Sequence, residues 1–223
     1  MRAFFKSSIG RKMVVAVTGL VLFIFVIFHM LGNLQIFLGA DALNDYARHL
    51  DELPYLLWPA RAVLLAALLL HVGFSLALAN ENRRARPVRY VHGDTVQASR
   101  ASRTMVITGL VILFFIIYHL LHFTFGVTNP EFFHLTDAKG REDIYSMVVL
   151  SFQNGWIAGT YILAMFFLCL HLGHGVSSVP QSLGFSESSG LRKNFGRFGN
   201  LAGVLVFIGN SSIVLAVLLG KLK

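Results

Sequence analysis

The chain alternates between long apolar stretches and shorter polar segments. An α-helix rises about 1.5 Å per residue, so roughly 20 apolar residues cross the hydrocarbon core of a membrane. Five stretches reach that length, at residues 14–36, 55–79, 104–127, 155–178 and 201–220. The pattern predicts an all-α integral membrane protein whose five transmembrane helices form a single domain over residues 1–223. The first stretch is too long for a signal peptide and lacks a small-residue cleavage site, so we expect it to be retained.

Charge alternates along the polar segments. The chain is 55% hydrophobic and only 13% charged, which is too apolar for an ordinary soluble domain. Basic residues gather in three segments: Arg2, Lys6, Arg11 and Lys12; Arg83, Arg84, Arg86, Arg89, Arg100 and Arg103; Arg192, Lys193 and Arg197. The other two segments are acidic, with Asp41, Asp45, Asp51 and Glu52, and with Glu131, Asp137, Glu142 and Asp143.

This alternation predicts the orientation. Because basic segments stay on the cytoplasmic side, we expect a cytoplasmic N-terminus and a multi-pass protein of the bacterial inner (cytoplasmic) membrane. The same topology accounts for most of the net charge of +8, so nucleic-acid binding is not needed to explain it. We expect the segments 37–54 and 128–154 to be acidic outer loops and 181–199 to be a flexible, Gly- and Ser-rich connector.

Four histidines lie inside four of the apolar stretches: His29, His71, His119 and His171. A neutral imidazole in hydrocarbon leaves a donor and an acceptor unsatisfied, so histidines at such positions usually bind something. Four of them in one small protein indicate bound metal, and two haems in particular.

The apolar stretches contain two more histidines, His122 and His174, and an internal repeat selects the first four as the candidates. Residues 18–31 match residues 108–121 at an offset of 90, including a Thr-Gly pair and the histidine, and the second and fourth stretches match at an offset of 100 around theirs. His122 and His174 have no repeat partner. They lie one helical turn further on, where we expect them to meet headgroups, water or a haem propionate.

Depth then sorts the four histidines into pairs. His29 and His119 each lie 15 residues from the cytoplasmic start of their stretches, whereas His71 and His171 each lie 16 residues from the outer start of theirs. The count predicts two bis-histidine sites, an outer one with His29 and His119 and an inner one with His71 and His171, roughly 10 Å apart at about 1.5 Å per residue.

Haem suits such sites better than other metals do. Two imidazoles take the axial positions, and small residues allow close helix packing or leave room for the ring: Gly19, Gly109, Gly73, Gly173, Ala66, Ala67 and Ala164. We expect the second ring nitrogen to donate to the carbonyl one turn earlier, that of Phe25 for His29 and of Phe115 for His119. Zinc and copper sites call for more carboxylate, cysteine or methionine ligands, and covalent haem for a C-x-x-C-H motif. With a single cysteine, Cys169, any cysteine-ligated iron–sulfur cluster belongs to a partner.

The segments SIGRKMVVAVTG, FHMLGN, YHLLHF and LHLGHG resemble the cytochrome b558 family, the dihaem membrane anchors of succinate dehydrogenases and fumarate reductases. The resemblance covers nearly the whole chain. It implies two haems b, a flavoprotein subunit and an iron–sulfur subunit on the cytoplasmic face, and electron transfer to or from a membrane quinone, typically menaquinone. It also implies that His71 and His171 hold a proximal haem next to the iron–sulfur subunit and that His29 and His119 hold a distal one.

One departure from that family concerns protons. Some members carry a glutamate two residues before the ligand in the fourth helix, where this chain has Cys169, so their transmembrane proton pathway is not carried over. A quinone still exchanges protons. We expect Asp51 and Glu52 to serve that exchange, with His49, Tyr46 and Arg61 as weaker neighbours; the alternative is that they merely end an acidic loop.

Two other functions remain open at this stage. One is the dihaem cytochrome b of another respiratory dehydrogenase, of the hydrogenase or formate dehydrogenase type. The other is a haem-free, proton-coupled transporter whose histidines relay protons. The sequence also leaves open the physiological direction of the reaction and whether the whole complex forms a dimer.

Overall fold

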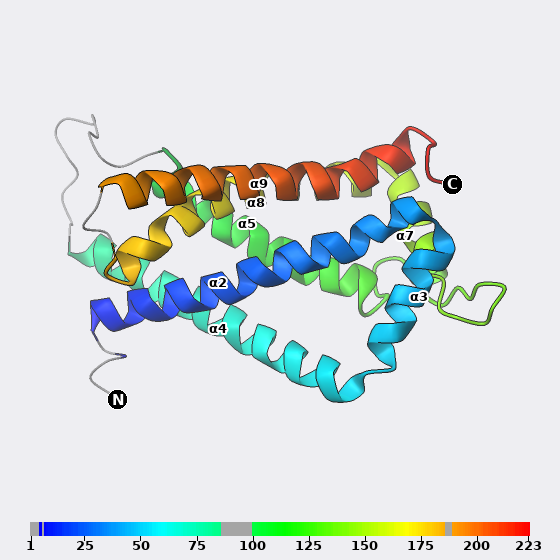
Figure 1. Ribbon diagram of the computed structural model, residues 1–223, viewed down its shortest axis with the longest axis horizontal. Helices are drawn as coiled ribbons and strands as arrows, with labels where there is room; N and C mark the ends of the chain where they lie inside the picture. The colour runs from blue at the N-terminus through cyan, green and yellow to red at the C-terminus, as the bar shows by residue number, and fades with distance from the viewer. Residues whose placement is uncertain (1–4, 6, 86–99, 186–188) are drawn as a thin grey trace.

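Five long helices run side by side, and shorter helices gather at one end (Figure 1). The computed structural model describes residues 5, 7–85, 100–185 and 189–223. The long helices are α2 (Ser8–Asn33), α4 (Pro54–Arg84), α5 (Arg100–Phe123), α8 (Gly155–Ser182) and α9 (Ser189–Leu218). All five are long and apolar enough to span a membrane. The predicted class, an all-α membrane protein with five transmembrane helices, is confirmed.

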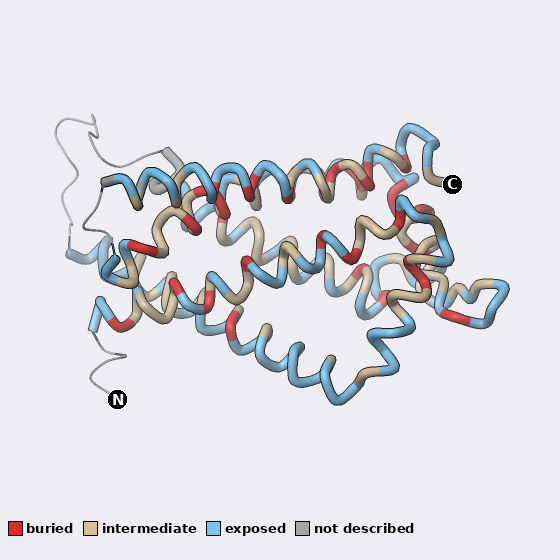
Figure 2. The backbone as a smooth tube through the Cα atoms, viewed as in Figure 1, coloured by how far each residue is buried: buried red, intermediate tan, exposed pale blue. Residues whose placement is uncertain are grey.

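The long helices pack as the repeat suggests. α2 lies against α4, α5 lies against α8, and α2 and α8 join the two pairs, while α9 runs along α8. Buried residues concentrate where α8 meets α9, whereas α4 buries only Ala67 and is otherwise exposed or half-buried (Figure 2). Its exposed side chains are mostly apolar, among them Leu65 and Leu69. Such a face is stable in lipid and would be a liability in water.

Helix α9 begins at Ser189, well before residue 201, and its glycines permit close packing against α8. A Cβ on Gly199 would lie 2.8 Å from the carbonyl oxygen of Gly173, and one on Gly203 would lie 2.7 Å from that of Cys169. Small residues let two helix backbones approach in this way. The prediction of a flexible connector over 181–199 is therefore wrong for residues 181–182, which end α8, and 189–199, which begin α9.

The sequence predicts that the two acidic segments are loops, but in the structure both contain helices. They hold η1 (Leu34–Leu38), α3 (Ala40–Asp51), α6 (Pro130–Phe133) and α7 (Ile144–Gln153). α3 buries Leu43 and Asn44 and leaves its carboxylates at the surface. It is therefore an amphipathic helix, although its many charges suggest a loop. Asp143 caps the N-terminus of α7, and its side chain accepts a hydrogen bond from the backbone N–H of Ser146. These short helices cover the end of the bundle opposite the N-terminus (Figure 1).

The two ends also differ in charge. Arg11 of α2 pairs with Glu81 of α4 at the end that carries the N-terminus. Four of the basic residues named above, Arg2, Lys6, Arg86 and Arg89, lie outside the described residues.

An ion-pair network fastens α3 to the segment before α7. The Arg141 side chain is 6% exposed and contacts Asp41 at 2.7 Å, Asp45 at 2.6 Å and Asp137 at 2.5 Å. Hydrogen bonds, first of all from the Arg141 side chain, hold the pKa of Asp137 well below its usual range. Asn44 adds a hydrogen bond to the Asp143 carboxylate at 3.1 Å. One arginine thus bridges three carboxylates from two segments.

Replacing Arg141 by methionine is expected to loosen this end of the bundle. The three carboxylates would repel one another without their common partner, and losing the centre of such a network is among the larger effects of single substitutions. Amide hydrogen exchange should speed up about tenfold or more in α3, with α9 unchanged. Lys139→Met is the matched control, because Lys139 reaches Asp41 from an exposed position, and exposed pairs contribute little. Equal exchange in both variants would contradict the prediction.

Candidate functional site

The four histidines lie as two pairs between facing helices. The ring centres of His29 on α2 and His119 on α5 are 5.7 Å apart, with an interplanar angle of 88°. Those of His71 on α4 and His171 on α8 are 6.4 Å apart, at 70°. The structure therefore brings together the same partners that the depth count pairs.

Two threonines orient the second pair. Nδ1 of His71 lies 3.1 Å from the Val15 carbonyl oxygen and 3.3 Å from the Thr18 hydroxyl, and Nδ1 of His171 lies 3.2 Å from the Thr108 hydroxyl. The Thr18 and Thr108 hydroxyls donate their own hydrogens to helix carbonyls. The Val15 carbonyl can only accept, which places the imidazole hydrogen of His71 on Nδ1 and leaves Nε2 free to bind a metal. The Thr108 hydroxyl, which donates to the Met105 carbonyl, can accept from Nδ1 of His171 in the same tautomer.

The glycine after each threonine makes room for the same imidazole. A Cβ on Gly19 would lie 3.0 Å from Cε1 of His71, and one on Gly109 would lie 3.3 Å from Cε1 of His171. The repeated Thr-Gly pair therefore acts on the histidine of the adjacent helix. Gly173 lies instead against Asn200, and Gly73 has open space beside it. Gly19 and Gly109 thus make room for an imidazole, and Gly173 allows the close packing of α9.

The first pair has a different environment. Nδ1 of His119 lies 3.4 Å from the Tyr161 hydroxyl. Its partner is therefore a side chain of α8, and not the carbonyl of Phe115 that the sequence predicts. His122 is 1% exposed, and both its ring nitrogens have protein partners, Tyr161 at 2.9 Å and Ser151 at 3.1 Å. The expectation that His122 meets water or headgroups is wrong, because α7 covers this end of α5.

Sequence reasoning did not single out Tyr161. Its ring packs against five other aromatic side chains of α5 and α7 besides His119: Phe115, Tyr118, His122, Phe123 and Phe152. The available signal was the single tyrosine of the apolar stretch 155–178, since a buried phenol needs a hydrogen-bond partner.

The geometry of both pairs fits an iron between two imidazoles. A metal–imidazole bond is about 2 Å long, so two rings on opposite sides of one metal ion have centres about 6 Å apart. The observed separations of 5.7 and 6.4 Å bracket that value. Within the described residues no three His, Cys, Asp or Glu side chains cluster as a metal site. Two protein ligands per site are what a haem iron takes, because the porphyrin supplies the other four.

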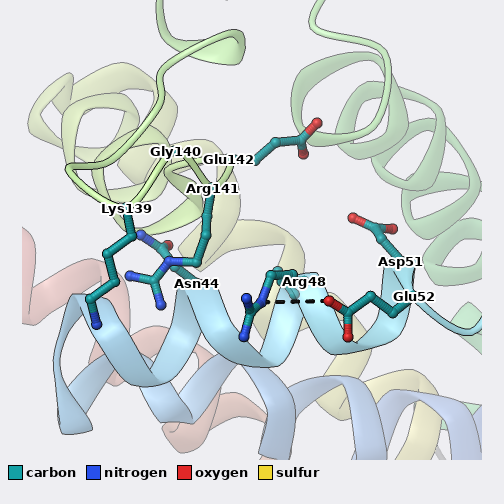
Figure 3. A pocket seen from close by; sticks show the side chains of 9 residues that line it. Asn44, Arg48, Asp51, Glu52, Lys139, Gly140, Arg141 and Glu142 are labelled. Carbon is teal, nitrogen blue, oxygen red and sulfur yellow. Dashed lines mark ion pairs between the residues drawn. The ribbon is translucent and has the colours of Figure 1, made fainter.

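The candidates for proton exchange lie elsewhere, at the acidic end. Asp51 ends α3, Glu52 follows it, and both are exposed. They line a polar pocket of about 430 Å³ between α3 and residues 139–142 (Figure 3). Arg48 reaches Glu52 at 3.8 Å in this pocket. Among the described residues, none of the four paired histidines contributes to its lining.

The three weaker candidates are dispersed. Tyr46 packs on α2, where a Cβ on Gly32, one turn beyond His29, would lie 2.7 Å from its hydroxyl oxygen. His49 is exposed, with Nδ1 3.1 Å from the Asp45 carbonyl. Arg61 lies over the Trp58 ring at 5.1 Å. Asp51 and Glu52 thus share a pocket that these three do not line.

Comparison with known proteins identifies the family. The family model described as succinate dehydrogenase/fumarate reductase transmembrane subunit matches residues 79–210, more than half of the chain. The chain belongs to this family. As a succinate dehydrogenase/fumarate reductase transmembrane subunit, it is a multi-pass membrane protein that assembles with the catalytic subunits of an oxidoreductase complex. The match includes His119 and His171 and the helices that carry them. Neither a search of the curated proteins nor one of the solved structures gave a match.

Proposed function

We propose that the chain is the cytochrome b anchor of a succinate:quinone or quinol:fumarate oxidoreductase and carries electrons between an iron–sulfur subunit and a membrane quinone through two haems b. The observation that carries this proposal is the pairing of four histidines, with ring centres 5.7 and 6.4 Å apart. Each haem iron would alternate between its ferric and ferrous states as single electrons pass.

The assignment of each pair rests on charge and topology. We place the proximal haem at His71 and His171 and the distal haem at His29 and His119. The basic end, with Arg11 and its neighbours, would face the cytoplasm, where the iron–sulfur and flavoprotein subunits dock. Thr18 and Thr108 would hold the proximal ligands in the tautomer that leaves Nε2 bare.

The quinone, menaquinone by the family resemblance, would react near the distal haem. We keep Asp51 and Glu52 as the groups that exchange its protons with the outer aqueous phase. Their exposure at the acidic end supports this role, because an exposed carboxylate equilibrates with water directly. The family match favours this function over a hydrogenase-type cytochrome or a haem-free transporter.

The haem content of the purified chain tests the proposal. About two protohaems per chain are expected by pyridine haemochrome assay, with reduced-minus-oxidised bands typical of low-spin, bis-histidine haem. A featureless spectrum from well-folded protein would end the haem hypothesis. Assays of the intact complex with menaquinol and fumarate, and then with succinate and a quinone, would establish the direction.

A further inference from the structure

A chain of hydrogen-bonding side chains leads away from His119. Its Nδ1 lies 3.4 Å from the Tyr161 hydroxyl, which lies 2.9 Å from Nδ1 of His122. Nε2 of His122 lies 3.1 Å from the hydroxyl of Ser151. Tyr161, His122 and Ser151 are 6%, 1% and 0% exposed. Three helices, α5, α8 and α7, contribute to this chain.

Metal binding by His119 would fix the direction of these hydrogen bonds. A neutral imidazole has one hydrogen, so an iron on Nε2 leaves that hydrogen on Nδ1, from where it points to the oxygen of Tyr161. The phenol then donates its own hydrogen to Nδ1 of His122, which carries its hydrogen on Nε2 and donates to Ser151. If every hydrogen bond pointed the other way, the hydrogen of His119 would lie on Nε2, the atom that must carry no hydrogen to bind an iron.

The His71–His171 pair has no comparable chain among the described contacts. Its hydroxyl partners, Thr18 and Thr108, donate to backbone carbonyls 2.7 and 3.1 Å away. Their hydrogen bonds therefore end on the main chain of the same helix. The phenol of Tyr161 donates to a buried side chain instead, so its strength as an acceptor depends on His122.

We infer that Tyr161, supported by His122, is a positioning residue that holds His119 in its metal-binding tautomer and sets the potential of the distal haem independently of the proximal one. This inference rests on the proposed function. By accepting the Nδ1 hydrogen, Tyr161 makes the imidazole more basic. A more basic ligand stabilises ferric iron more than ferrous iron and so lowers the potential.

A redox titration of the haem bands in the intact complex, with Tyr161→Phe, tests the inference. The variant keeps the aromatic packing but removes the acceptor. The ratio of reduced to oxidised distal haem at a fixed ambient potential should rise about tenfold, which for a one-electron centre is about 59 mV. His122→Phe should shift the same haem in the same direction by less. Thr108→Val is the matched control and should move only the proximal haem.

Each outcome of the titration bears on one hypothesis. Two haems with wild-type potentials in Tyr161→Phe would overturn the inference and leave the proposed function standing. If that variant loses the distal haem, His122→Phe decides: a raised distal potential supports the inference, and an unchanged one overturns it. Absence of haem from the wild-type complex would remove the proposed function and the inference together.

Discussion

Replacing His119 by alanine is expected to remove the distal haem and leave the proximal one in place. In the proposed function each iron would depend on two protein ligands from facing helices, and the counterpart of His119 is His29, at 5.7 Å between ring centres. Haem content should fall by about half, and the redox titration should retain one component. His29→Ala should give the same spectrum, whereas His71→Ala should remove the other component.

A variant of the neighbouring His122 tests whether the effect is specific to His119. His122 lies one turn from His119, but both its ring nitrogens are engaged by Tyr161 and Ser151. His122→Phe should therefore retain both haems. Loss of both haems, or of neither, in His119→Ala would contradict the pairing. Loss of a haem in His122→Phe with retention in His119→Ala would make His122 the ligand.

The pairing of the histidines follows from the sequence because it depends only on span direction and helical rise. The function of the Thr-Gly repeat does not follow in the same way. The repeat shows that Thr18 and Thr108 occupy equivalent positions, but not which helix packs against them. That His71 and His171 are their partners depends on the contact of α2 with α4 and of α5 with α8, which is a property of the packed bundle.

The environment of His119 and His122 was beyond sequence reasoning for a related reason. α7 is an apolar helix of 10 residues, too short to span a membrane and placed among acidic residues that indicate a loop. Its packing over the end of α5 buries His122 and supplies Ser151. Likewise, the glycines at the start of α9, such as Gly199, are typical of a flexible connector in the sequence. In the structure they allow α8 to approach closely.

Replacing Gly19 by valine is expected to weaken or abolish proximal haem binding. Even an alanine Cβ would lie 3.0 Å from Cε1 and 3.3 Å from Nδ1 of His71, and the two further methyls of valine add to the crowding. The ring has little freedom to move, because Nδ1 is held by the Val15 carbonyl and the Thr18 hydroxyl. We expect a loss of about tenfold or more in haem retention at this site, with the distal haem unchanged. Difference spectra during dilution into apomyoglobin, which captures released haem, measure it.

Two further glycines distinguish crowding of the imidazole from general damage to the helices. At Gly109 a Cβ would lie 3.3 Å from Cε1 of His171, a slightly looser contact, so Gly109→Ala should weaken the proximal haem less than Gly19→Ala. Gly159 is exposed on α8 and has open space beside it, so Gly159→Val should retain both haems at wild-type rates. Equal losses at Gly19 and Gly159 would refute the role assigned to the Thr-Gly pair. A graded loss, confined to the haem at His71 and His171, would tie the repeated glycine to the ligand of the neighbouring helix.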